Sequence, residues 1–142
     1  MTRRIPGWLH ARVPYIAIAV TTIAVGLAVH WYGTSLGRAA RDVLGDLLWA
    51  VMMTWWIAAL VPGVRPPIRA AMALVICFVV ETSQLYHTPA LDAFRSTAIG
   101  HLFLGSGFDP RDLAAYSLGV LAAVLVERIA LRRTRTSSLG PL

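Results

Sequence analysis

GDLLWAVMMTWWIAALV, residues 45–61, is an apolar run with one charged side chain, Asp46, near its start. A helix of roughly 20 apolar residues crosses the hydrocarbon core of a bilayer, and lengths of about 17–25 occur. Three more such runs are present, at about 13–30, 68–86 and 113–131. We therefore predict an all-α fold, a polytopic integral membrane protein with four transmembrane helices.

The overall composition agrees with this fold class. Hydrophobic residues make up 57% of the 142 residues, charged residues 14%, and the mean hydropathy is +0.65. Soluble domains have about 45–50% apolar and about 25% charged residues. The composition excludes a disordered chain and disfavours an ordinary cytosolic enzyme. We expect residues 1–142 to form a single membrane domain.

The first apolar run has two interpretations. Arg3 and Arg4 precede it, as in a signal peptide. However, His30, Trp31 and Tyr32 follow the apolar core, in place of the small residues of a cleavage site. We expect a retained helix.

The arginines predict the orientation. Four spans place both termini on one side, with nine arginines there: Arg3, Arg4, Arg12, Arg65, Arg69, Arg128, Arg132, Arg133 and Arg135. Four lie on the other side: Arg38, Arg41, Arg95 and Arg111. Because cytoplasmic loops carry the excess of positive charge, we expect both termini to be cytoplasmic, in a bacterial plasma (inner) membrane. The net charge of +6 is then a matter of topology, and no nucleic-acid partner is expected.

Residues 90–108 form the least regular segment. The part at about 92–104 is apolar but too short to cross a membrane, so we expect an interfacial or re-entrant helix before the last span. Asp92 is the expected cap at its start, and Gly105 the residue at its end. Asp109 followed by Pro110 is a start signal for the fourth span.

Polar residues gather near the outer ends of the spans. Charged groups inside a membrane are costly and by default suggest a site. The set comprises Asp42, Asp46, Glu81, Gln84, Arg95, Asp112 and Tyr116. Glu81 and Gln84 share a helix face, as do Asp112 and Tyr116. Arg95 is the candidate counter-charge, with Glu81 or Asp112 as its partner; the result is either a structural ion pair or an anion site.

The remaining polar and aromatic residues suggest no cofactor or metal site. Cys77 lies in an apolar run and is expected to be a packing residue. His87 and His101 lack metal-ligand spacing. Trp55 is expected to face lipid or the interface. Glu127 is expected to pair with Arg128, Arg132 or lipid headgroups.

Several short motifs occur in an order that resembles a known family. They are Arg41-Asp42-x-x-Gly45-Asp46-x-x-Trp49-Ala50, Glu81-x-x-Gln84-Leu85-Tyr86, Leu91-Asp92-x-x-Arg95-x-Thr97-x-x-Gly100, Leu104-Gly105-x-x-Phe108 and Asp112-Leu113-x-x-Tyr116-x-x-Gly119. Together they resemble the bacterial membrane family catalogued as domain of unknown function 2809. They are also distantly similar to VanZ-like membrane proteins, which are associated with the cell envelope and with glycopeptide tolerance. Those proteins usually carry Asn where Tyr116 stands. Neither resemblance implies a settled activity.

Four functions remain open at this point. In the first, Arg95, Gln84 and Tyr116 bind an anionic lipid headgroup or a lipid-linked envelope intermediate, with Asp42, Asp46, Glu81 and Asp112 as a supporting cluster. The alternatives are a small proton-coupled transporter, in which Glu81 binds the proton, and a purely structural accessory protein. An enzyme is least favoured, because no GxSxG, HExxH or aspartate-rich motif is present. The expected partners are the bilayer and an anionic lipid; a homo-oligomer or a membrane partner protein is left open.

Overall fold

The structure, a computed structural model, describes residues 7–97, 99–100, 104–105 and 107–138. Of these residues, the side chains are described from residue 12 to residue 130. The long helices are α1 (Gly7–Tyr32), α2 (Arg38–Leu60), α3 (Pro66–Ser83) and α6 (Pro110–Ser138). A short helix, α4 (Pro89–Arg95), precedes α6, and a 3-10 turn (Gly33–Leu36) joins α1 to α2. Four helices contain windows long and apolar enough to cross a membrane. The predicted all-α fold class is confirmed.

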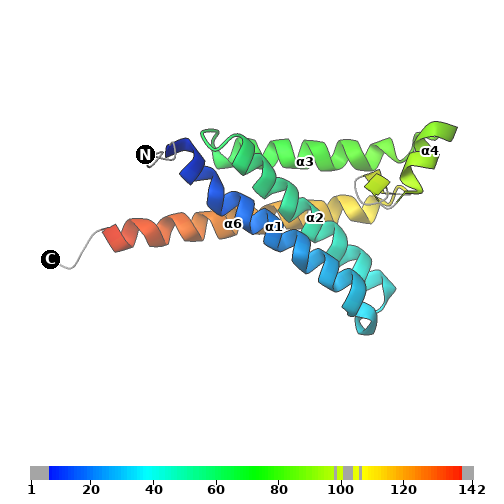
Figure 1. The fold of residues 1–142 in the computed structure, drawn as a ribbon, viewed down its shortest axis with the longest axis horizontal. Helices are drawn as coiled ribbons and strands as arrows, with labels where there is room; N and C mark the ends of the chain where they lie inside the picture. The colour runs from blue at the N-terminus through cyan, green and yellow to red at the C-terminus, as the bar shows by residue number, and fades with distance from the viewer. Residues whose placement is uncertain (1–6, 98, 101–103, 106, 139–142) are drawn as a thin grey trace, which may run out of the picture.

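The four long helices form a bundle in which α2 is central. It packs against α1, α3 and α6, and α6 also packs against α3. In Figure 1, α1 and α2 run side by side and cross α3 and α6 obliquely. One end of the bundle carries α4 and the α1–α2 connection; we call it the α4 end. The opposite end, the α2–α3 end, carries the turn between those helices, the start of α1 and the last turns of α6.

The seam between α2 and α6 is closed by small residues. Ala115, Gly119 and Ala123 lie at intervals of four on α6, and all three are buried. A Cβ atom added to Gly119 would lie 2.4 Å from the carbonyl oxygen of Leu47 on α2. Because small residues let backbones approach closely, this spacing favours tight helix packing in membranes. This face of the last span therefore points into the bundle.

The short helix begins earlier than predicted. The helix begins at Pro89, because the Thr88 side chain accepts a hydrogen bond from the backbone N–H of Leu91 (3.3 Å) and acts as the N-cap. Asp92 therefore lies in the first turn and is not the cap. α4 ends at Arg95, and residues 98 and 101–103 of the predicted 92–104 helix lie outside the described part of the chain.

Asp109 and Pro110 form the start of the last span, as predicted. The backbone N–H of Arg111 donates to the Asp109 carboxylate (2.9 Å), and Pro110 occupies the first helical position. The helix starts three residues before the predicted 113. The second span likewise starts at Arg38, earlier than the predicted 45, so Arg41 and Asp42 lie within α2. The third span ends at Ser83, earlier than the predicted 86.

Large apolar side chains cover much of the outer surface. Exposed examples on α3 are Ile68, Met72, Val75 and Val79, and on α1 Val13, Ile16 and Val20. Soluble monomers rarely expose continuous apolar surface of this extent. Such a surface is favourable in contact with hydrocarbon, so the exposed residues agree with a bundle surrounded by lipid.

Candidate functional site

Glu81, in the last turn of α3, is the centre of the polar cluster at the α4 end. Its side chain is 0% exposed. Oε2 accepts hydrogen bonds from the Gln84 amide (3.0 Å) and the Tyr116 hydroxyl (3.1 Å), and Oε1 accepts one from the backbone N–H of Asp109 (2.8 Å). These donors come from the end of α3, from α6 and from the residue that caps α6. One carboxylate thus ties α3 to α6. The contact between Glu81 and Gln84 agrees with the helix face that the sequence predicts them to share.

Two more carboxyl groups meet beside Glu81. The side chains of Asp46 on α2 and Asp112 on α6 lie within hydrogen-bonding distance of each other. Glu81 and Asp42 are close enough to interact electrostatically with both, and Asp109 with Asp112. We call these five residues the acid cluster. Sequence analysis identified four of its members as a supporting set and assigned Asp109 only a capping role.

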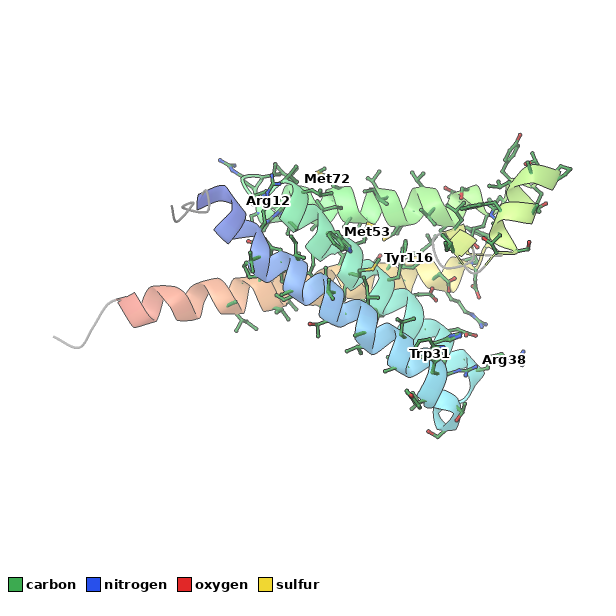
Figure 2. The ribbon with its side chains drawn as sticks, viewed as in Figure 1. Arg12, Trp31, Arg38, Met53, Met72 and Tyr116 are labelled. Carbon is green, nitrogen blue, oxygen red and sulfur yellow. The ribbon has the colours of Figure 1, made fainter. Side chains whose placement is uncertain are left out.

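Tyr116 joins the acid cluster to the apolar core. Tyr116, labelled on α6 in Figure 2, belongs to the same buried core cluster as Ala50 of α2 and Ala73 and Cys77 of α3. Its hydroxyl donates to Glu81. The expectation that Cys77 is a packing residue agrees with its complete burial in this core. The hydroxyl proton of Tyr116 is therefore donated to a protein carboxylate in this arrangement.

The Tyr116→Phe variant tests this hydrogen bond. The change removes one of the three donors to a buried carboxylate, so we expect the free energy of unfolding to fall by about 1–2 kcal/mol. Thermal unfolding in detergent, followed by tryptophan fluorescence, measures the loss. Tyr32→Phe is the matched control, because Tyr32 is exposed; equal stabilities for the two variants would contradict the assigned bond.

Arg95, buried at the end of α4, does not pair with either predicted partner. Nη1 donates to the carbonyl oxygen of Tyr86 (2.9 Å) and Nη2 to that of Ser83 (2.7 Å). Its acidic partner is Asp92, three residues earlier (3.6 Å). The sequence-based prediction named only acids on other helices, and this pair was missed. Arg95 therefore satisfies carbonyl groups at the C-terminal end of α3 and holds α4 against it.

Three glycines of the sequence motifs lie where a side chain would collide. A Cβ at Gly100 would approach the Phe94 carbonyl oxygen, one at Gly105 would lie 2.6 Å from the Gln84 amide nitrogen, and Gly119 meets α2 as described above. Gly105 also has a φ of +63°, which favours glycine. The motif glycines therefore shape the loop over Gln84 and the α2–α6 seam. Gly45 differs, because nothing lies within 4 Å of its added Cβ.

A second polar cluster, at the α2–α3 end, was missed by the sequence analysis. Glu127 on α6 forms a buried ion pair with Arg69 on α3 and accepts a hydrogen bond from the Tyr15 hydroxyl (3.0 Å). Tyr15 stacks on Trp55, whose side chain is 4% exposed. Glu127 thus pairs with Arg69 and not with Arg128, one of its expected partners; the side chain of Arg132 lies outside the described residues. The expected lipid-facing position of Trp55 is wrong.

A signal for this second cluster was present in the sequence. Arg69, Ala73, Cys77 and Glu81 follow one another at intervals of four, and all four are buried. Residues four apart lie on one helix face. This face of α3 thus carries a charge at each end and small residues between them. Extending the face of Glu81 back to Arg69 would have predicted that the arginine points into the bundle.

Within the described residues, no group of three or more His, Cys, Asp or Glu side chains is arranged to hold a metal ion. His87 lies beside Asp92 on the surface (3.0 Å). His101, the other histidine considered near this end, lies outside the described residues.

Comparison with known proteins identifies the family. No solved structure matches the chain. A family model described as protein of unknown function (DUF2809) matches residues 36–120, which include α2, α3, α4 and the motif residues up to Gly119. The match covers more than half of the chain and confirms the first resemblance; the distant similarity to VanZ-like proteins stays a prediction. The acid cluster, Arg95 and the three motif glycines all lie within the matched range, and the chain belongs to the DUF2809 family of proteins of unknown function.

Proposed function

We propose that this chain is a small multi-pass membrane protein that binds and releases a proton at the acid cluster, as a proton-coupled transporter. The observation that carries the proposal is the approach of Asp46 on α2 to Asp112 on α6. Of the functions left open by the sequence, the proton-coupled alternative fits this geometry best. The anion-binding alternative fits less well, because Gln84 and Tyr116 both donate to Glu81.

The chemistry of two adjacent carboxyl groups supports proton binding. A carboxylate only accepts hydrogen bonds, so a hydrogen bond between two carboxyl groups needs a proton on one of them. Glu81 already accepts three hydrogen bonds from other groups and is not a partner in this one. Intramembrane carboxyl groups in such chains commonly act as proton relays.

The position of this pair links the proton to helix packing. Asp46 and Asp112 lie on α2 and α6, the two helices that pack tightly at Gly119. Loss of the shared proton would place two like charges together across the α2–α6 seam. Their repulsion would favour separation of the helices, and protonation would favour closure. Proton binding and a change in the bundle would then be coupled.

Infrared difference spectroscopy of the protein in lipid vesicles tests proton binding directly. The wild type should show a protonated-carboxyl band that disappears on raising the pH. Asp46→Asn and Asp112→Asn should each remove the band. Asp92→Asn, which removes an exposed acid at the same end of the bundle, should keep it.

Flux measurements test the coupled transport. Vesicles that contain wild-type protein and a pH-sensitive dye should dissipate an imposed pH gradient faster than empty vesicles. Asp112→Asn should abolish most of this difference, and Asp92→Asn should retain it. Absence of wild-type flux at every gradient, together with no titrating carboxyl band, would contradict the proposal.

A second candidate function, binding of an anionic headgroup at Arg95, is favoured by one observation. Nε of Arg95 is buried and has no hydrogen-bond partner. A phosphate oxygen would supply the acceptor that this nitrogen lacks. Native mass spectrometry of the wild type and of Arg95→Ala in mild detergent tests this. Lipid retained by Arg95→Ala would refute the candidate, and Arg111→Ala, which removes an exposed arginine at the same end, is the control.

We further propose that the α2–α3 end faces the cytoplasm, as the nine-to-four distribution of arginines predicts. Thr34 and Gly63 are exposed in the connections at opposite ends of the bundle. In a Cys77→Ala background, a membrane-impermeant maleimide should label Thr34→Cys in intact cells. Gly63→Cys should be labelled only after the cells are opened. The reverse pattern would invert the topology.

A further inference from the structure

Arg69, near the start of α3, has a guanidinium group with unused hydrogen-bond donors. The residue is 3% exposed. Nη2 pairs with Glu127, whereas Nε and Nη1 have no hydrogen-bond partner. A buried donor without an acceptor is unfavourable, and a buried guanidinium more so. Nε and Nη1 of Arg69 therefore lack an acceptor among the described residues.

The surrounding residues fix the guanidinium in place. Its carbon lies 5.3 Å from the centre of the Tyr15 ring, and the Tyr15 hydroxyl donates to the same Glu127 oxygen that Arg69 contacts. Tyr15 is itself stacked on Trp55. Because the Tyr15 ring covers one face of the guanidinium, a hydrogen-bond acceptor must approach the N–H groups in the plane of the guanidinium. The arginine is held by residues of α1, α2 and α6.

The charge at this end favours an anion. Arg65, four residues before Arg69, is exposed, and so is Arg128, the residue after Glu127. Arg12 donates to the carbonyl oxygen of Leu60 at the same end. Among the described side chains of the α2–α3 end, Glu127 is the acid, and it pairs with Arg69. Arg69 lies in the first turn of α3, close to the end of the bundle, where lipid headgroups meet a membrane helix.

We propose that the Arg69 guanidinium binds an oxyanion of the phosphate type at the α2–α3 end through one of its unpaired nitrogens, Nε or Nη1. Arginine donors match phosphate oxygens in charge and geometry. Glu127 and Tyr15 act as positioning residues, which hold Nη2 and the ring face so that the other nitrogens are presented. Both nitrogens are covered, so binding requires a small movement of a covering side chain. This site lies at the opposite end from the acid cluster and does not depend on the proposed proton binding.

Thermal unfolding in dodecyl maltoside tests the site with inorganic phosphate. Sodium phosphate should raise the melting temperature of the wild type by several degrees relative to sodium chloride at equal ionic strength. Arg69→Gln combined with Glu127→Gln should lose this protection, because it removes the guanidinium without leaving a lone buried charge. Arg128→Gln, which removes an exposed arginine at the same end, should keep it.

A lipid arm separates the two sources of phosphate. Micelles with phosphatidylglycerol should protect the wild type more than micelles with a phosphate-free galactosyl diacylglycerol. Protection by the phospholipid alone assigns the site to a headgroup, and protection by both phosphate probes assigns it to a free anion as well.

A single-residue variant tests the site even if the double variant does not fold. Arg69→Lys keeps the pair with Glu127 but lacks the Nε and Nη1 donors, so it should remain folded and show reduced protection. Protection of Arg69→Lys equal to that of the wild type would overturn the proposal. So would the absence of protection of the wild type by either probe, which would mean that buried water satisfies the two nitrogens.

Discussion

Glu81→Ala is expected to lower the free energy of unfolding by about 4 kcal/mol or more, the largest loss for a single polar side chain in this bundle. The change removes the acceptor for Gln84, Tyr116 and the Asp109 backbone together. Each buried donor left without a partner costs about 1–3 kcal/mol. Equilibrium unfolding in mixed detergent and dodecyl sulfate micelles, followed by tryptophan fluorescence, measures the difference.

Two variants define what the Glu81→Ala result means. Glu81→Gln keeps the shape and one acceptor oxygen but directs an amide toward the donors, so its stability should lie between those of Glu81→Ala and the wild type. Thr82→Ala, at the next position, changes an exposed side chain that bonds only within its own helix and should have little effect. A wild-type stability for Glu81→Ala would show that the donors find other acceptors.

Gly119→Ala should destabilise the bundle by about 3 kcal/mol, at the upper end of what one added carbon causes in a packed interior. The new Cβ would lie 2.4 Å from the Leu47 carbonyl oxygen and 3.0 Å from the Cβ of Ala50. The backbone oxygen cannot turn aside, so α2 and α6 must separate. Because Asp46 and Asp112 face each other across this seam, the same variant should also weaken their contact.

The same substitution at Gly45 provides the control. Nothing lies within 4 Å of a Cβ at this position, which is also in the interior of α2. Alanine favours a helix over glycine by about 1 kcal/mol, so Gly45→Ala should be neutral or stabilising. Opposite signs for the two Gly→Ala changes, measured in the same unfolding assay, would confirm that packing at the seam and not helix propensity sets the loss. Equal effects would contradict the assigned seam.

The two polar clusters are joined by one face of α3. Arg69 and Glu81 lie at opposite ends of that face, with Ala73 and Cys77 between them. Both charged residues reach α6, the first through Glu127 and the second through Tyr116. The contact between α3 and α6 therefore consists of polar ends and a small-residue centre. Such an arrangement fixes the register of the two helices, because a shift by one turn would separate both pairs.

The sequence alone determined the elements and several of their ends. Apolar length identifies a membrane span because the thickness of the hydrocarbon sets the number of residues needed. Asp109 and Pro110 mark the start of α6 because their effect on the backbone is local. The ordered motifs identified the family. Each of these features depends on residues close together in the chain.

The tertiary structure decided which faces meet. Helical periodicity shows that Arg69 and Glu81 share a face, but it does not show which residues of another helix that face contacts. The crossing of α3 with α6 brings Glu127 to Arg69, and the return of α4 against the end of α3 occupies Arg95 with carbonyl groups. The burial of Trp55 likewise depends on where α1 crosses α2. Partners distant in sequence are chosen by the packing of whole helices, and the packing depends on all of their side chains together.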